Sequence, residues 1–420
     1  MLKLSSFDTY KKELLDLGYS PAKIQSSEFN TTLDILAKSG IPNSRHEEWK
    51  YFPLHTLLAP EYLLAPKSKD QYSPTDFAPF IQDAVHLIVV NGQLINVQEL
   101  QSIPGITISI NEKAISHGDD NSRTNPFPLL NSLLFHEEIS ISFDSSYSNE
   151  HPIHVLHIIS GNPELPLLAS PALSISAHNG VSATIIESFH VREVKNGLIN
   201  ASVLIHAESD SKLHHVIIED GLKDIVLLYT CHSKVQGNGK VQDHVIVHDS
   251  HSVRNTITGS LQQEYATYNV YGIVSGHEKS VIDNHTTVDH IAPHCESNEL
   301  FKHVLADSST AVFNGKIFVQ RDAQKTNAYQ SNRTLLLSPS ATINTKPQLE
   351  IFADDVKCSH GATTGSVDEE ALNYLRARGI SKEVALKLLT EAFIGEVVQL
   401  LENDTLREYF EGSILLESGN

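Results

Sequence analysis

Short apolar runs recur along most of the chain, from residue 85 to residue 360, with turn residues between them. Examples are "HLIVVNGQ", "ASVLIHAESD", "DHVIVHDS" and "SVIDNHTTVDH". Each run has the length of a strand and is rich in Val, Ile and Thr, and in most of them apolar and polar positions alternate. The pattern therefore predicts a long series of strands, most of them with one face buried.

The spacing of these runs, about ten residues, is typical of either a β-sandwich or a β-solenoid. The region is longer than the ~100 residues of an immunoglobulin-like sandwich and shows no cysteine–tryptophan core signature. A coiled stack of short strands, each burying one face against its neighbours, fits this length better. Because no strict repeat can be read from the sequence, the periodicity alone leaves both alternatives open.

Residues 1–65 show helical periodicity and few strand signals, and Gly40 and Pro42 mark a break in this region. Leu14 and Leu17 lie among charged residues, as expected for an amphipathic helix. The one tryptophan, Trp49, is followed by aromatic residues at positions 51 and 52. We interpret this group as an aromatic anchor that holds the helical region to the next domain.

Helical periodicity returns after "HGATTG". Ser366 and Glu369 have the spacing of a capping box, and the helix that they begin is predicted to stop at Gly379. Ser381 is predicted to cap a longer helix over 382–402. Its apolar positions follow the i, i+3, i+4, i+7 rule and form a stripe of Ala385, Leu388, Leu389, Ala392, Phe393, Val397 and Leu400. This stripe must pack on the solenoid or on another protein.

We therefore expect three regions: an N-terminal helical region over 1–65, a β core over 66–362, and a C-terminal helical domain over 363–420.

The chain carries 51 acidic and 31 basic residues, a formal net charge of −20. This charge repels phosphate backbones and anionic lipids, so neither nucleic acid nor a membrane is an expected partner. No apolar run reaches the ~20 residues that cross a bilayer, and the first residues lack the features of a signal peptide. Three widely spaced cysteines argue against a disulfide framework. We expect a cytoplasmic protein.

The sequence offers no motif for hydrolysis or redox chemistry. "VQGNGKVQ" contains glycines and a lysine, but not the GxxxxGK[ST] spacing whose amides wrap a phosphate. Two close glycines between strands are more often a turn. We therefore expect no ATP site and no enzymatic activity in this chain alone.

Most of the 23 histidines lie between residues 151 and 303. Residues i and i+2 of a strand share a face, so the adjacent His214 and His215 point to opposite faces. His290, His294 and Cys295 come closest to a ligand cluster, although a proline interrupts them and a structural zinc site normally has four ligands.

His244 and His248 share one face of a strand, and Val245 and Val247 occupy the other. The valines are the natural inward set, so we expect these two histidines to lie in solvent.

Cys358 and His360 lie in "DDVKCSH", and both side chains share a face if this segment is extended. Thiolate and imidazole suit zinc, copper and iron–sulfur centres, but a cluster needs about four donors. The spacing alone leaves two alternatives open. The pair is either half of a site that another chain completes, or a buried cysteine beside a structural histidine.

Several segments, in the same order, resemble the SufD family of the SUF iron–sulfur cluster assembly system. They are "AVFNGKI", "AQKT", "TKPQLEI", "DDVKCSHGAT" and "YLRARGI", and "GIPNSRHEEWKY" resembles a segment near the N-terminus of that family. The paralogous SufB chains usually carry a "HEAT"-like stretch where this chain reads "SHGAT", so the resemblance favours SufD over SufB.

The resemblance implies a right-handed parallel β-helix flanked by N-terminal and C-terminal helical domains. It also implies a scaffold without ATPase activity, which pairs with SufB and binds the ATPase SufC through its C-terminal helices. A transient Fe–S cluster would be built at the SufB–SufD interface, with sulfur delivered by a cysteine desulfurase system through SufB.

Mapped onto this chain, the family's ligand at that interface is His360, with Cys358 as a second candidate. Pro347 and Leu349 of "TKPQLEI" are candidates for interface packing, and the stripe of residues 385–393 is a candidate surface for SufC.

The sequence leaves several points open: a role in iron acquisition, FAD bound by the complex, and a homodimer in place of the SufB partnership. Three alternative functions also stay open. They are a SufB-like paralogue, a purely structural SufC adaptor without metal contact, and a β-helix carbohydrate-active enzyme.

Overall fold

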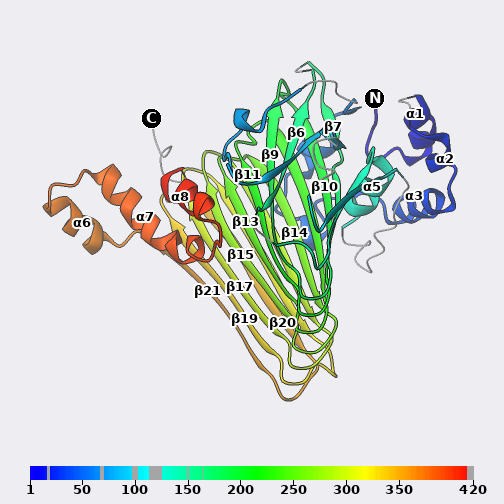
Figure 1. The fold of residues 1–420 in the computed structure, drawn as a ribbon. Coiled ribbons are helices and arrows are strands. Elements are labelled where there is room, and N and C mark those ends of the chain that lie inside the picture. The colour runs from blue at the N-terminus through cyan, green and yellow to red at the C-terminus, as the bar shows by residue number, and fades with distance from the viewer. Residues whose placement is uncertain are drawn as a thin grey trace.

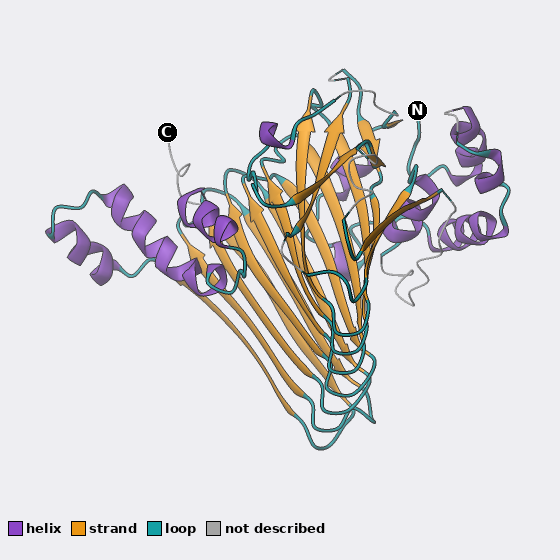
Figure 2. Ribbon diagram, viewed as in Figure 1, coloured by secondary structure: helices purple, strands orange, loops and turns teal. Residues whose placement is uncertain are grey.

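Strands that alternate along the chain build two separate sheets, which face each other across a long core (Figure 1). The structure is a computed structural model and describes residues 1–16, 19–66, 71–96, 103–112, 125–148, 151–162 and 164–413. The two sheets form a β-solenoid of about seven turns between residues 153 and 366, with helices at both ends (Figure 2). The prediction of a β-helix core flanked by helical regions is confirmed.

The first sheet has the order β20-β18-β16-β14-β12-β10-β8-β5-β4, with β7 and β1 beside β10. Its strands are β1 (Leu63–Leu64), β4 (Ile106–Asn111), β5 (Glu138–Phe143), β7 (Leu167–Ala169), β8 (Ala172–Ala177), β10 (Gly197–Ala207), β12 (Ile225–Val235), β14 (Ser252–Leu261), β16 (Val281–His290), β18 (Thr310–Val319) and β20 (Thr342–Ile351).

The second sheet has the order β21-β19-β17-β15-β13-β11-β9-β6-β2-β3. Its strands are β2 (Val85–Val90), β3 (Gln93–Leu94), β6 (Ile153–Ser160), β9 (Ser182–Arg192), β11 (Lys212–Asp220), β13 (Lys240–His248), β15 (Thr267–Gly276), β17 (Glu296–Leu305), β19 (Asn327–Leu336) and β21 (Lys357–Ser366).

The helices come from the parts of the chain before and after the solenoid (Figure 2). They are η1 (Phe7–Thr9), α1 (Tyr10–Asp16), α2 (Pro21–Ile24), α3 (Ser27–Ser39), η2 (Glu47–Trp49), α4 (Leu54–Leu58), η3 (Pro74–Asp76), α5 (Phe127–Leu134), α6 (Glu369–Ala377), α7 (Lys382–Val398) and α8 (Asp404–Ser413). In the part of the chain that the structure describes, none of them has the length and apolar character needed to span a bilayer.

One coil of the solenoid comprises two strands and two turns. Ser252 pairs with Val281, and Val281 pairs with Thr310, so a coil takes 29 residues in this part. One turn of each coil contains a residue with left-handed φ, in the series Asp210, Asn238, Tyr265, His294 and Lys325. The repeat unit is therefore two strands long, and turns of unequal length conceal it in the sequence.

The interior of the solenoid is filled by alternate side chains of both sheets. Val245 and Val247 of β13 lie inside as predicted, fully buried in the central hydrophobic cluster. His244 and His248 lie on the outer face, but they are only 0% and 6% exposed. The prediction that they lie in solvent is wrong, because the outer face of this sheet is itself a packing surface for α7 and α8.

The N-terminal helices and α5 cover the outer face of the first sheet, where they form one hydrophobic cluster with residues of β7, β10 and β12. Leu14 is fully buried in that cluster, whereas Leu17 lies outside the described residues. Trp49 is 1% exposed, and its ring lies 5.1 Å from that of Phe127. The predicted aromatic anchor is confirmed for Trp49 and Phe52, which are both buried in this cluster, whereas Tyr51 is exposed.

The C-terminal helices pack on the outer face of the second sheet through α7 and α8, while α6 projects away from the solenoid (Figure 1). Ser381 caps α7 as predicted, since its hydroxyl accepts the amide of Val384 at 3.3 Å. Gly379, with φ of +87°, follows the end of α6. The long helix ends at Val398, earlier than the predicted residue 402.

The predicted capping box of Ser366 and Glu369 is wrong. Ser366 is the last residue of β21 and pairs with Leu336, so it belongs to the sheet. Asp368 is the actual cap of α6, because its carboxylate accepts two amides of the first turn. β21 extends to residue 366, a few residues beyond the predicted boundary between core and C-terminal domain at 362/363. The division of the chain into three domains stays a prediction.

Candidate functional site

The solenoid ends at β20 and β21, the last strands of the two sheets. β20 pairs with β18 and β21 with β19, and among the described residues neither strand has a partner on its other side. Nearly all of β21 is exposed. A strand with a free edge presents unpaired N–H and C=O groups and is a template for pairing with another chain.

Cys358 and His360 lie on the inward face of β21. Cys358 is in register with Ala328, which is fully buried in the solenoid, and His360 is in register with Gln330. Cys358 is half-buried, and burial raises the pKa of its thiol. His360 is exposed. The two side chains therefore share a face at the open end of the solenoid, although no third donor of this chain completes a metal site with them among the described residues.

Pro347 and Leu349 lie on β20 at the same open end, each half-buried. Leu349 is in register with Ile317 and packs on the same small apolar cluster as Cys358. Pro347 is in register with Gly315. A proline is suited to an edge strand, because it lacks the N–H that a central strand would use.

A polar column continues from His360 into the solenoid. Gln330, one coil below, donates its side-chain amide to Glu299 Oε1 at 3.2 Å, and Thr286 donates its hydroxyl to the other oxygen of Glu299. Gln330 Oε1 is buried without a hydrogen-bond partner. Gly315 makes room for this side chain, since a Cβ there would lie 2.3 Å from Gln330 Nε2. The residue beside His360 is thus fixed by packing and retains a free acceptor.

At pH 8 we expect Glu299→Gln to raise the free energy of unfolding above that of the wild type by up to about 3 kcal/mol. At pH 4 the two proteins should have nearly the same free energy of unfolding. Burial raises the pKa of Glu299 from 4.5 to about 7. The proton that Glu299 holds in the folded protein therefore stabilises the fold below pH 4.5, and this contribution is lost as the pH rises through 7. Urea unfolding at pH 4, 6 and 8 measures the effect.

Glu278→Gln is the matched control, because this glutamate is exposed and should leave the pH dependence unchanged. A Glu299→Gln variant with the same pH dependence as the wild type would contradict the buried, protonated carboxyl.

A second buried polar group lies deep in the solenoid, around Glu187. Its carboxylate accepts from His157 Nε2 at 2.7 Å and from His215 Nε2 at 2.8 Å. Tyr229 donates its hydroxyl to the same carboxylate at 2.7 Å. Burial raises the pKa of Glu187, but the hydrogen bonds from the two histidines outweigh it and hold the pKa below its ordinary value. Glu187 is therefore a buried carboxylate with three donors.

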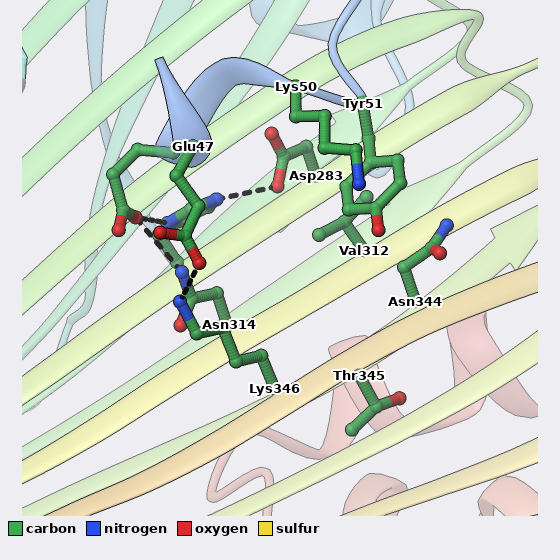
Figure 3. A pocket seen from close by; sticks show the side chains of 11 residues that line it. Glu47, Lys50, Tyr51, Asp283, Val312, Asn314, Asn344, Thr345 and Lys346 are labelled. Carbon is green, nitrogen blue, oxygen red and sulfur yellow. Dashed lines mark hydrogen bonds and ion pairs between the residues drawn. The ribbon is translucent and has the colours of Figure 1, made fainter. Parts of the chain in front are cut away.

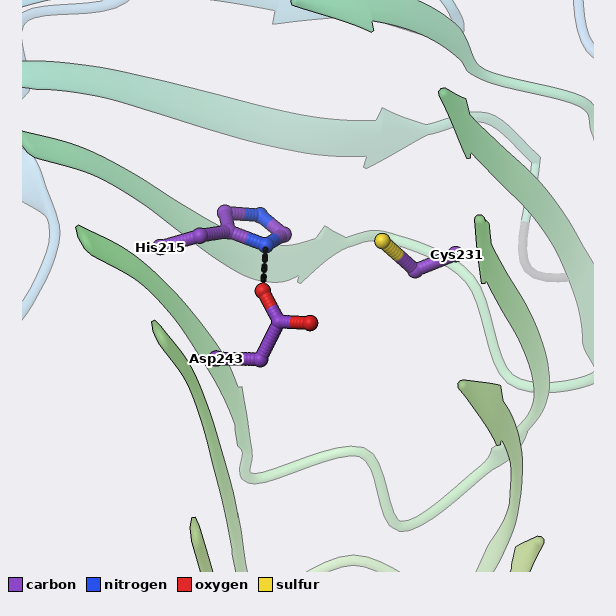
Figure 4. A group of neighbouring side chains, drawn as sticks. All are labelled: His215, Cys231 and Asp243. Carbon is purple, nitrogen blue, oxygen red and sulfur yellow. Dashed lines mark hydrogen bonds and ion pairs between the residues drawn. The ribbon is translucent and has the colours of Figure 1, made fainter. Parts of the chain in front are cut away.

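The other ring nitrogen of His215 faces Asp243, with 3.1 Å between Nδ1 and Oδ1, and Cys231 lies beside them (Figure 4). Burial lowers the pKa of His215, but its bonds with Asp243, Cys231 and Glu187 raise it well above the ordinary value. Burial, assisted by the charge of Asp243, raises the pKa of Cys231 to about 11. The group therefore places the ring of His215 between two carboxylates, with the thiol of Cys231 at its side.

The sequence pattern did not indicate this group. His215 and Asp243 occupy equivalent positions in β11 and β13, one coil apart, and Cys231 comes from the facing sheet. A repeat of 28 residues in this part would have aligned the first two. The trio that sequence analysis did note is dispersed: His290 bonds Ser297 inside the solenoid, and His294 stacks on Tyr265 in a turn.

A polar pocket of about 290 Å³ lies where η2 meets the outer face of the first sheet (Figure 3). Arg254 donates to the carbonyl of Glu48 at 2.8 Å and pairs with Asp283, while its guanidinium lies 3.8 Å from the centre of the Trp49 ring. His285 bridges Glu48 and Asp283, at 3.1 and 2.9 Å. The bond with His285 lowers the pKa of the Glu48 carboxyl. This group ties the "RHEEWKY" segment to the solenoid.

Arg254→Lys is expected to lower the free energy of unfolding by about 2 kcal/mol, because lysine keeps the charge but loses the planar stacking on Trp49 and one or more hydrogen bonds. Limited proteolysis should also cut the N-terminal region faster. Arg333→Lys is the control, since Arg333 makes an exposed ion pair with Glu396 and should change stability by less than about 0.5 kcal/mol. Equal effects of the two substitutions would contradict the role of Arg254 as an anchor.

The predicted apolar stripe of α7 divides between two surfaces. Ala385 is fully buried and Leu389 is half-buried, while Phe393 is half-buried and packs on the hydrophobic cluster between α7 and the solenoid. Leu388 and Ala392 are exposed. They border a pocket of about 630 Å³ beside α8, lined by Leu388, Glu391, Ala392, Ile394, Gly395, Glu396, Val398, Gln399 and Glu411. Part of the predicted stripe, with Leu388 and Ala392, therefore stays open in the single chain, beside the acidic residues that line the pocket.

Residues 158–393 match the family described as "SUF system FeS cluster assembly, SufBD core domain", and this match covers more than half of the chain. The chain belongs to the SufBD family. SufBD proteins serve iron–sulfur cluster assembly and are not a family of catalytic enzymes. The carbohydrate-active alternative is therefore set aside.

Similar proteins support this assignment over most of the chain. The iron–sulfur cluster assembly protein SufD of Escherichia coli (strain K12) is 28% identical over 393 residues, 91% of each chain. A SufBD family protein of Synechocystis sp. is 29% identical over 396 residues, 87% of this chain and 85% of its own. "Protein ABCI7, chloroplastic" of Arabidopsis thaliana is 44% identical over 131 residues, 31% of this chain and 28% of its own. The predicted resemblance to SufD is confirmed.

Proposed function

We propose that this SufBD protein is a scaffold subunit that pairs with a SufB-type partner through the open end of its solenoid and carries a SufC-type ATPase on its C-terminal helices. A nascent iron–sulfur cluster is built where the two solenoids meet. One observation carries the proposal. The free edges of β20 and β21 lie at the same end of the solenoid as the inward-facing Cys358 and His360.

The ligand set at this end supports a shared site. His360 is exposed beside the free edge and Cys358 is half-buried behind it, so this chain supplies at most two donors. A cluster needs about four, and a partner that pairs with β21 would bring the others to the same place. Iron and sulfide are the cargo here, and the SufB-type partner delivers the sulfur that it receives from a cysteine desulfurase.

Gln330 supports His360 as the ligand rather than Cys358. A ring N–H of His360 can donate to the unpartnered Oε1 of Gln330, in register on the next strand. That bond would fix the tautomer and leave the second ring nitrogen for iron, the arrangement that metal-binding histidines commonly use. Cys358, packed beside Leu349, contributes to the apolar surface around the site.

The C-terminal helices support the proposed contact with the SufC-type partner. The exposed side of α7, with Leu388 and Ala392, borders a large open pocket, while the other side fixes the domain to the solenoid. ATP binding and hydrolysis belong to the SufC-type partner. Its movement would reach the open end through α7 and the stiff stack of strands that α7 covers.

Iron entry through this chain, FAD bound by the complex and a homodimer through the same edges are extensions of this proposal. A homodimer would use the β20–β21 end and would therefore compete with the SufB-type partner. An adaptor without metal contact is the second candidate function, and it predicts normal assembly and normal cluster loading without His360.

The test is co-expression with SufB-type and SufC-type partners, comparing wild type with Thr364→Pro. The amide of Lys357 donates to the chain that leads into β19. Because successive amides of a strand point to opposite sides, those of residues 358, 360, 362, 364 and 366 point to the free edge. Proline at exposed position 364 removes one of these amides and should prevent pairing with the SufB-type partner, while the SufC-type partner stays bound.

Thr364→Val is the matched control, because it keeps the amide and the branched shape, and it should pair normally. A Thr364→Pro chain that still co-purifies with the SufB-type partner would refute pairing through this edge. Loss of both partners would indicate a folding defect, which circular dichroism of the isolated variant detects.

A further inference from the structure

The donor atoms around Asp243 are close enough to share one ion. One ligand atom each from His215, Cys231 and Asp243 lies within 4.8 Å of the other two, and all three residues are buried. The three side chains converge from β11, β12 and β13 on one space inside the solenoid (Figure 4). Imidazole, thiolate and carboxylate together are a ligand set for zinc and ferrous iron.

The surroundings orient these groups as the outer partners of a metal site do. His215 donates its Nε2 hydrogen to Glu187 at 2.8 Å, which leaves Nδ1 directed at Asp243 and Cys231. Tyr268 donates its hydroxyl to the second oxygen of Asp243. A carboxylate behind the histidine and a donor on the ligating carboxylate are typical supports of a bound ion. Cys231 bonds to His215 and has a further, weak partner in the hydroxyl of Ser233 at 4.0 Å.

Metal binding replaces the protons on the ligating atoms. As a divalent ion binds, the thiol proton of Cys231 and the Nδ1 proton of His215 leave to water, and no electron moves. Two positive charges arrive and two depart, so the step balances.

We propose that His215, Cys231 and Asp243 bind one divalent transition metal ion, zinc or ferrous iron, inside the solenoid. The ion connects three consecutive strands across both sheets and so staples adjacent coils to each other. Because the site is enclosed by buried side chains, the ion enters as the coils close during folding. This site lies apart from the open end and does not depend on the function proposed for that end.

The experiment is metal analysis of the isolated full-length chain, expressed without partners in media supplemented with zinc, iron or cobalt and purified anaerobically. We expect close to one ion per chain in the wild type, and the zinc and iron cultures show which metal is preferred. Cobalt should give the near-ultraviolet charge-transfer band of a cobalt–thiolate bond. Cys231→Ser should abolish this band, and both Cys231→Ser and Asp243→Asn should lower the metal content by at least about tenfold.

Cys295→Ser is the matched control, since Cys295 is equally buried and donates to a backbone carbonyl away from the trio. It should keep both the metal and the band. A wild-type chain without metal in all three cultures, or a Cys231→Ser chain that retains it, would overturn the proposal. Neither result bears on partner binding or on His360, so the two proposals fail independently.

Discussion

Replacing His360 with alanine is expected to lower the iron and acid-labile sulfide recovered with the assembled complex by at least about tenfold, while the complex itself stays intact. The side chain is exposed on the last strand, so its removal costs this chain little stability. It does remove the donor that Gln330 would orient toward the partner. Anaerobic co-purification with both partners, followed by iron and sulfide determination per complex, measures the effect.

Two variants of the same strand serve as controls. Ser359→Ala changes a neighbouring exposed residue on the opposite face of β21 and should leave the loading unchanged. Cys358→Ser separates the two candidate ligands: a loss as large as that of His360→Ala would make the thiol a ligand, and normal loading would leave it as packing. Normal loading of an intact His360→Ala complex would contradict cluster building at this end and favour the adaptor function.

Replacing Glu187 with alanine is expected to lower the free energy of unfolding by roughly 3–5 kcal/mol. The carboxylate accepts hydrogen bonds from His157, His215 and Tyr229. All three donors are buried, so water cannot replace the acceptor that they lose. Of its two carboxylate partners, His215 would then keep only Asp243. Urea unfolding followed by circular dichroism measures the loss.

Glu208→Ala is the control, because Glu208 also pairs with a histidine, His178, but on the surface, and its removal should cost less than about 0.5 kcal/mol. If the alanine variant does not fold, Glu187→Gln keeps the size of the side chain and should still unfold at a clearly lower urea concentration. A Glu187→Ala protein within about 1 kcal/mol of the wild type would show that these hydrogen bonds are replaced by other contacts.

The strands of the solenoid were predictable because their apolar positions alternate, and this alternation depends only on the two-residue period of an extended chain. The burial of His244 and His248 on the outer face of β13 was not predictable from the alternation. The valines between them do point inward, but α7 and α8 return from far along the chain and cover the other face as well. Alternation identifies the two faces of a strand, not what covers each of them.

The candidate site was predictable to the same extent. That Cys358 and His360 share a face follows from their spacing, and the structure has them on one face. Their surroundings were not predictable, because only the register of neighbouring coils places Gln330 beside His360 and Glu299 beside Gln330. The same holds for His215 and Asp243. Coil length is set by turns of unequal size, so residues that meet across coils have no fixed distance in the sequence.

The stacking of coils has a consequence for amide hydrogen exchange. Inner strands such as β17 are hydrogen-bonded to a coil on each side, whereas β20 and β21 have one neighbouring strand each within the described part of the chain. Fraying of the stack therefore begins at the coil that contains Cys358 and His360, and protection of the amides should increase from there inward. A partner strand that adds to this edge converts the coil most prone to opening into an interior one. If the proposed partner binds here, its binding and the local ordering of the β20–β21 end are therefore one equilibrium, in which the partner strand caps the stack of coils.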